Sequence, residues 1–409
     1  MNQRRIDKIM DSLKEAGLTQ ALLSDPFSLT YVTGDNFRPG ERFLALLLRE
    51  GQKPALFLNR LFFAPHVAPE NIVPYDDTER GALKALPLID RSRPLGVDKK
   101  MPAEFLLELQ QRNAASGYVN ASPCVDHVRA CKDAEEIALM VRASQMNDQA
   151  MLALRERVRE GVTEIGLADE LAGIYRELGA DGLSFPSIVS FGANAADPHH
   201  SPDGTVLKPG QCVLFDIGCV KDGYCSDMTR TYYFKTVGAK DREIYEITRR
   251  ANESAEAAMK PGVRYCDLDG IARKVIADAG YGPYFTHRLG HSIGQQGHGG
   301  GDVSSANTER VRPGFFRRAG HLPSRRDGRA HRRSVPDHRD GRTDPQSGSQ
   351  GASDHRMTPT PRRGCENKIV SLSARGKSFL SLVFRQRCAY NNQAFIEDTT
   401  ALKRVVLNF

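Results

Sequence analysis

Two aspartates lie in a segment whose pattern predicts a β-hairpin. Asp216 ends one apolar run, and Asp227 comes eleven residues later, just before another run of β-branched and aromatic residues. A Lys-Asp-Gly sequence at 221–223 is a turn signal between the two runs. If the hairpin is centred on the first two of these turn residues, the carboxylates pair directly across the strands, where like charges repel. The pair therefore predicts a bound cation, although two solvent-facing aspartates on a sheet would give the same pattern.

Three histidines follow within twelve residues, at His287, His291 and His298, with glycines between them. Imidazole suits borderline transition metals, and glycine allows close approach of the backbone. A single histidine is more often structural, whereas three at this spacing favour a metal or substrate site. A fourth, His199, lies in a polar segment just before the hairpin.

The order and spacing of three motifs carry a family resemblance. FGANAADPHHSPDG, VLFDIGCVKDGYCSDMTRT and FTHRLGHSIG resemble the motifs of the pita-bread metallopeptidases. That family includes Xaa-Pro dipeptidase (prolidase), aminopeptidase P, methionine aminopeptidase and the metal-free creatinases. The first 125 residues resemble the creatinase/prolidase N-terminal domain, which favours the proline-specific branch. The resemblance extends to about residue 314.

The resemblance implies that Asp216, Asp227 and His291 are metal ligands. In the family, two divalent cations roughly 3.5–4 Å apart activate a water that attacks the carbonyl preceding proline. Mn²⁺ or Co²⁺ suits a carboxylate-rich set with one imidazole, and Zn²⁺ is a further option. The implied function is metal-dependent hydrolysis of the Xaa-Pro peptide bond.

The resemblance also implies catalytic roles for the other histidines. His199 and His298 match residues that position the scissile peptide and stabilise its tetrahedral intermediate, and His287 matches a histidine near the substrate. Gly299 departs from the family, which usually has glutamate at this position. The implied partners are a proline-containing peptide substrate and a second copy of the chain in a homodimer.

The elements that must position these residues fall into two predicted domains. Residues 1–125 predict an α/β domain that begins with an amphipathic helix over 1–17. Its apolar segments predict short strands over 21–34, 43–51, 54–59 and 95–100, with a helix over 102–113. Residues 126–316 predict an α+β pita-bread domain that is incomplete at its C-terminal end. Its helices are expected over 133–158, 163–180, 242–262 and 266–280, with a strand over 184–194 and the hairpin over 205–234.

The amino-acid composition and the match to the family's motifs change after Gly314. Twelve arginines and no lysine occur from Arg317 to Arg363, and the two glutamate motifs of the family, EPG and VRIED, are absent. If the codons from Arg317 onward are read after dropping one nucleotide, the genetic code allows VEPGIYLPGEMGVRIED. Arg318 and Arg332 then stand at the positions of the two metal-binding glutamates. We therefore predict a frame shift, with 317–409 an irregular out-of-frame tail and activity lost or weak.

Charge supports an alternative function. Residues 316–409 hold 19 Lys and Arg against 8 Asp and Glu, whereas the preceding residues hold 38 against 42. A catalytically dead binding module could use such a basic tail to contact nucleic acid. The tail lacks interleaved aromatic residues and periodicity, so the frame shift explains its composition more simply. A metal-free creatinase-like hydrolase ranks lower, because that branch does not keep the two aspartates.

Composition also bears on location. No run of 18 apolar residues is present, the first 17 residues do not resemble a secretory leader, and the eight cysteines lack paired CxxC spacing. We expect a cytoplasmic protein with reduced thiols and no membrane contact.

Overall fold

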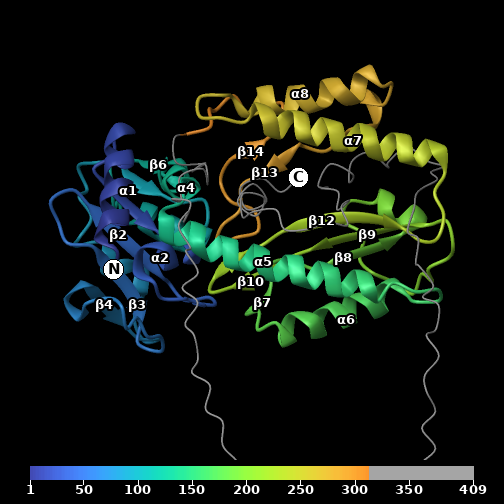
Figure 1. Cartoon of the computed structure of the whole chain (residues 1–409). Coiled ribbons are helices and arrows are strands. Elements are labelled where there is room, and N and C mark those ends of the chain that lie inside the picture. Colours follow the sequence, from blue (N-terminus) through green and yellow to red (C-terminus); the bar gives the residue numbers. More distant parts are fainter. Residues whose placement is uncertain (313–409) are drawn as a thin grey trace, which may run out of the picture.

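The computed structural model describes residues 1–312, which form two domains linked by the long helix α5 (Ala134–Glu156) (Figure 1). The N-terminal domain lies at one end of the molecule, and α5 runs from it along the second domain. None of the helices in residues 1–312 is long and apolar enough to cross a membrane. The predicted tail, with Arg318 and Arg332, lies outside the described residues.

The N-terminal domain is built on one six-stranded sheet with helices on both faces. The strand order is β4-β3-β2-β1-β5-β6. The strands are β1 (Gln20–Leu23), β2 (Ala45–Arg49), β3 (Ala55–Asn59), β4 (Ile72–Tyr75), β5 (Leu95–Val97) and β6 (Tyr118–Asn120). The helices are α1 (Gln3–Glu15), α2 (Pro26–Thr33), α3 (Ala103–Gln111) and α4 (Ser122–Ala130), with short 3₁₀ turns η1 (Pro69–Asn71) and η2 (Gly81–Ala85). Two apolar clusters fill the two faces of the sheet.

Helix α1 shows how the sequence dictates this packing. Asn2 caps it by accepting a hydrogen bond from the backbone N of Arg5 at 3.2 Å. Ile6, Ile9 and Leu13 follow at helical spacing and are buried in the cluster on one face of the sheet. Burying each such side chain stabilises the fold by about 1.5–3 kcal/mol, which is why the apolar stripe of α1 faces inward.

The segment 21–34 differs from the prediction, since it holds a strand followed by helix α2. Asp25 accepts a hydrogen bond from the backbone N of Ser28 at 3.0 Å, and Pro26 suits the first helical position. The helix ends at Gly34, whose φ of 83° is left-handed. These cap residues outweigh the strand preference of the apolar run.

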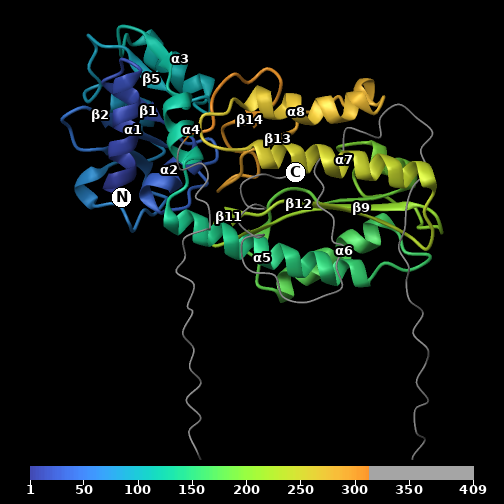
Figure 2. The same cartoon turned by 45° about the horizontal axis from the view of Figure 1, so that its top comes forward.

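The second domain places a small set of strands between two pairs of helices. Helices α5 and α6 (Glu164–Glu177) lie on one side, and α7 (Ala239–Ala258) and α8 (Tyr265–Asp278) on the other (Figures 1 and 2). The strands are β7 (Gly182–Leu183), β8 (Ile188–Phe191), β9 (Cys212–Ile217), β10 (Cys219–Lys221), β11 (Tyr224–Cys225), β12 (Met228–Tyr233), β13 (Gly290–His291) and β14 (Asp302–Val303). Short 3₁₀ turns are η3 (Gly192–Ala196) and η4 (Gly282–Tyr284). The strands of this domain form three sheets, with the orders β12-β9-β8, β11-β10-β7 and β13-β14.

Candidate metal centre

The hairpin that carries the two aspartates has a register different from the predicted one. Asp216 on β9 pairs with Thr229 on β12, so the predicted direct pairing with Asp227 is wrong. The reason is the turn, which is centred on Asp222 and Gly223, both with left-handed φ (51° and 75°). A tight two-residue hairpin turn needs positive φ at both central positions, and Asp-Gly meets that need better than Lys-Asp.

The shifted register still leaves Asp227 near the strand pair that carries Asp216. Asp227 lies directly before β12, two residues before Thr229, which is the partner of Asp216. Asp216 is fully buried, and only 8% of Asp227 is exposed.

Thr229 holds Asp216 in place, a role that sequence reasoning missed. Its Oγ1 donates a hydrogen bond to Asp216 Oδ1 at 2.7 Å, and both residues are buried. Threonine is common in strands for its β-branched shape, so composition alone gave no sign of this contact. The register itself, once the turn is centred correctly, would have identified the pair.

His291 lies next to Asp227 in a buried position. Its Nε2 lies 3.7 Å from Asp227 Oδ2, and its side chain is 1% exposed. Its Nδ1 lies 3.2 Å from the carbonyl O of Ser292, which can only accept, so the neutral ring carries its hydrogen on Nδ1. The lone pair of Nε2 then faces the Asp227 carboxylate. One cation can bind both atoms, because each metal–ligand bond is roughly 2.0–2.2 Å long.

The segment after β13 brings a second imidazole to this set. The ring of His298 lies 4.1 Å from the ring of His291, centre to centre, and its side chain is exposed. The loop is tied to the hairpin, since the backbone N of Cys225 donates to the carbonyl O of Gly294 at 2.8 Å. The histidine segment and the hairpin therefore form one unit.

Gly299 is required by close packing. A Cβ added there would lie 2.7 Å from Ser292 Oγ, too near for any real contact. Ser292 itself donates to the carbonyl O of Gly300. The glutamate usual in the family at this position would not fit here without moving the loop.

The two remaining predicted histidines lie on segments that lead into β13 and out of β8. His287 is half-buried, and its Nδ1 hydrogen-bonds the carbonyl O of Arg288 at 2.7 Å. His199 is exposed in the loop after η3, with its backbone N donating to Asp197 Oδ1 at 2.9 Å. The structure thus brings Asp227, His291 and His298 together, leaves Asp216 on the same hairpin as Asp227, and places His199 and His287 on flanking segments.

A buried network supports the strand that carries Asp216. Tyr175 on α6 donates from its hydroxyl to Asn147 Oδ1 at 2.5 Å, and Asn147 Nδ2 donates to the carbonyl O of Ile217 at 3.0 Å. Burial raises the pKa of Tyr175 well above its usual value, with further electrostatic contributions from Cys219, Asp227 and Asp216. The phenol therefore stays neutral and acts as a hydrogen-bond donor. All six cysteines within residues 1–312 are free thiols.

A second cluster, which sequence reasoning did not single out, joins Glu164, His200 and Asp203. Their potential ligand atoms all lie within 4.8 Å of one another. Both carboxylate oxygens of Glu164 already accept hydrogen bonds, including bonds from the backbone N of Phe191 and of Asp203. The cluster therefore holds a loop together without any need for a cation.

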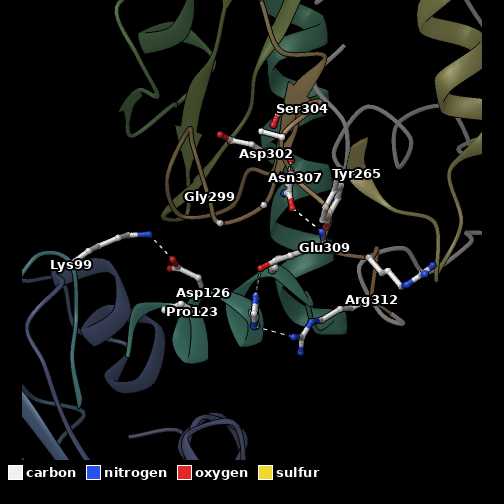
Figure 3. A pocket seen from close by; sticks show the side chains of 16 residues that line it. Lys99, Pro123, Asp126, Tyr265, Gly299, Asp302, Ser304, Asn307, Glu309 and Arg312 are labelled. Atoms are coloured by element: carbon white, nitrogen blue, oxygen red, sulfur yellow. Dashed lines mark hydrogen bonds and ion pairs between the residues drawn. The ribbon is translucent and has the colours of Figure 1, made fainter. Parts of the chain in front are cut away.

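A cavity of about 520 Å³ opens beside the glycine segment that follows His298 (Figure 3). Lys99 and Asp126 form an ion pair on its N-terminal-domain side. On the other side lie Arg312 and Glu309 of the second domain, which contact His127 of α4: Arg312 donates to His127 Nδ1 at 2.9 Å, and Glu309 Oε1 lies 3.3 Å from His127 Nε2. Both domains thus line the space next to the candidate site.

Comparisons with known proteins match both domains. The sequence profile of Metallopeptidase family M24 matches residues 138–316, and that of the Creatinase/Prolidase N-terminal domain matches residues 5–131. An uncharacterized peptidase of Staphylococcus saprophyticus is 34% identical over 318 residues, which cover 76% of this chain and 89% of that protein. A dipeptidase from Pyrococcus horikoshii superposes with a TM-score of 0.70 at 29% identity, covering 76% of this chain and 88% of that one. A prolidase from Thermococcus sibiricus gives a TM-score of 0.69 at 29% identity, covering 77% and 88%.

Proposed function

Because the chain belongs to metallopeptidase family M24, with a creatinase/prolidase N-terminal domain before its pita-bread domain, we propose that its site is built to hydrolyse the Xaa-Pro peptide bond. The similar solved structures include proteins described as a dipeptidase and as prolidases. The proposed substrate is therefore a peptide with proline after the scissile bond.

The observation that carries the proposal is the buried contact between Asp227 and His291, with a second buried carboxylate, Asp216, on the same hairpin. Buried carboxylates are costly unless a cation or hydrogen bonds balance them. These three residues would hold divalent metal ions, on which enzymes of this family depend, with Mn²⁺ or Co²⁺ the proposed choice. When bound, the metals would polarise the substrate carbonyl and lower the pKa of a water for attack at neutral pH.

The histidines supply hydrogen-bond donors around that centre. His298 lies beside His291 on the exposed side, where a peptide would arrive. We assign it the task of donating to the substrate carbonyl oxygen as negative charge develops there. His199 is proposed to orient the peptide from the loop after η3, and His287 to line the substrate side.

We further propose that the chain as translated is impaired. Two divalent cations carry a charge of about +4, which the family balances with two aspartates and two glutamates. Asp216 and Asp227 supply half of that negative charge, and the sequence holds Arg318 and Arg332 where the glutamates belong. Within residues 1–312, β12 pairs with β9 alone, which leaves its second edge for strands of the restored reading frame.

The test compares the chain as given with a chain whose reading frame is restored after Phe316. Both are assayed on Xaa-Pro dipeptides and on longer Xaa-Pro peptides with Mn²⁺ or Co²⁺ added. We expect turnover only in the restored chain, and Asp227→Asn in that chain should abolish it. Equal activity in both chains would refute the inference about the glutamates, and inactivity in both would refute the proposed reaction.

Assembly as a homodimer and a cytoplasmic location stay predictions. Light scattering during size-exclusion chromatography checks the first on the chain as given. A monomer at micromolar concentration would contradict it.

A further inference from the structure

Glu164 is a buried acid that the proposed reaction does not use. It is the first residue of α6, and none of its side chain is exposed. Burying a carboxylate costs several kcal/mol unless hydrogen bonds or charges compensate. What compensates Glu164 is therefore informative about the role of this residue.

The compensation comes from the last residue of β8 and from the loop between β8 and β9. Glu164 Oε1 accepts hydrogen bonds from the backbone N of Phe191 at 2.6 Å and from Asn194 Nδ2 at 3.1 Å. Glu164 Oε2 accepts from His200 Nε2 at 2.6 Å and from the backbone N of Asp203 at 3.2 Å. Bonds to a charged acceptor are roughly twice as strong as neutral ones, so one side chain holds four points of the loop.

The backbone at the start of α6 reinforces this anchor. The backbone N of Glu164 donates to the carbonyl O of Thr205 at 3.2 Å, and that of Ile165 donates to the carbonyl O of Asp203 at 3.0 Å. Thr163 forms a β-bridge with Val206. The start of the helix thus fixes both the entry and the exit of the loop 191–206.

His199 stands at the exposed tip of this loop, next to the anchored His200. Its backbone N is fixed by Asp197, and the backbone N of His200 donates to the carbonyl O of Asp197 at 3.3 Å. The side chain of His200, the next residue, is hydrogen-bonded to the fully buried carboxylate of Glu164. The backbone position of His199 is therefore restrained by a contact one residue away.

We propose that Glu164 and His200 form a positioning pair that fixes the loop 191–206 and thereby holds His199 at the substrate. The proposal rests on the function proposed above for His199. Glu164 is a positioning residue, since it contacts the loop and not the reacting atoms. The same geometry argues against a cation at this cluster, because both oxygens of Glu164 already face backbone N–H groups.

The bonding pattern predicts that even an isosteric change breaks the anchor. In Glu164→Gln, one oxygen becomes an NH₂ group that can only donate. In either orientation of the amide, that group faces a backbone N–H, of Phe191 or of Asp203, and two donors repel. His200 can change its tautomer to adapt, whereas a backbone amide cannot.

The first test uses the full chain as it exists and needs no activity. Hydrogen–deuterium exchange with mass spectrometry should show the loop 192–206 exchanging at least about tenfold faster in Glu164→Gln. Glu177→Gln is the matched control, since Glu177 is exposed at the far end of the same helix. His200→Ala should also loosen the loop, and His200→Gln, which can still donate, should restore much of its protection. Unchanged exchange in Glu164→Gln and His200→Ala would overturn the anchor.

The second test separates positioning from mere stability, in the chain with its reading frame restored. Glu164→Gln should lower kcat roughly 100-fold with KM nearly unchanged and metal content the same, because a misplaced catalytic group costs turnover. A loosened loop with unchanged kcat and KM would overturn the role for His199. Inactivity of the restored parent chain would refute the proposed function instead, while the exchange experiment would still decide the anchor.

Discussion

The candidate site is assembled from two kinds of support, a strand hairpin and two loops. Asp216 and Asp227 belong to a hairpin whose register continues over six cross-strand pairs, from Ile217 and Met228 to Cys212 and Tyr233. His199 and His298 stand in loops that are positioned by side chains and by close glycine contacts. A carboxylate on the hairpin keeps its place through many backbone bonds, whereas a histidine on a loop depends on one or two neighbours. Damage elsewhere in the chain should therefore spare the carboxylates more than the histidines.

The largest expected effect comes from removing a hairpin carboxylate. In the restored chain, Asp216→Asn should weaken metal binding by more than about 100-fold, since loss of a ligand exceeds the effect of losing its supporting partners. Metal content by mass spectrometry and hydrolysis of an Xaa-Pro dipeptide measure the loss. Asp222→Asn in the turn of the same hairpin is the control, because asparagine tolerates the left-handed φ of 51°. Full metal content in Asp216→Asn would contradict the assignment.

A smaller effect should follow from loosening that carboxylate without removing it. Thr229→Val deletes the hydroxyl that donates to Asp216 Oδ1 and keeps the shape of the side chain. We expect metal affinity in the restored chain to fall about 10- to 100-fold, as for other groups that orient a ligand. Thr231→Val on the same strand should change little, since the Thr231 hydroxyl makes no hydrogen bond within residues 1–312. Equal metal affinities in the two variants would contradict a role of Thr229 in orienting Asp216.

The smallest expected effect is on the free energy of unfolding and its pH dependence, and it comes from Lys132, next to the loop that carries His298. Lys132 packs against Gly294, and burial lowers the pKa of its amine to about 8, although Glu136 acts in the opposite direction. Because the folded pKa lies below the unfolded value of 10.5, the desolvated ammonium destabilises the fold below about pH 8, and this cost fades as the pH rises toward 10.5.

Lys132→Met should therefore raise the melting temperature at pH 7, with a gain that shrinks between about pH 8 and 10.5. Thermal unfolding followed by circular dichroism across this range measures the gain. A gain that stays constant with pH would show that packing, and not the buried charge, is responsible.

The elements that carry the candidate ligands could be predicted in part, because they show clear sequence periodicity. Helix α1 follows from Ile6, Ile9 and Leu13, and the hairpin follows from two strand-forming runs around Asp222 and Gly223. The turn centre was missed by one residue, because the prediction placed it on Lys221 and Asp222, whereas Asp222 and Gly223 suit the two positive φ values that the turn requires. That single step changed the partner of Asp216.

The contacts that position the loops could not be predicted, for a different reason. Glu164 follows a threonine N-cap, and its local sequence is that of an ordinary first residue of a helix. Its burial depends instead on contacts with a segment that begins nearly thirty residues later, at Phe191. Gly299 can be explained only by the position of Ser292, which no local pattern encodes. Contacts between segments distant in sequence carry no period, and the structure is needed to find them.

A calorimetric titration of Mn²⁺ tests the central claim most directly, since it measures the metal centre without requiring turnover. We predict two Mn²⁺ ions per chain once the reading frame is restored. The chain as given should bind at least about 100-fold more weakly, because it keeps Asp216, Asp227 and His291 and lacks the two glutamates. Equal stoichiometry and affinity in the two chains would contradict the claim that the lost segment supplies metal ligands.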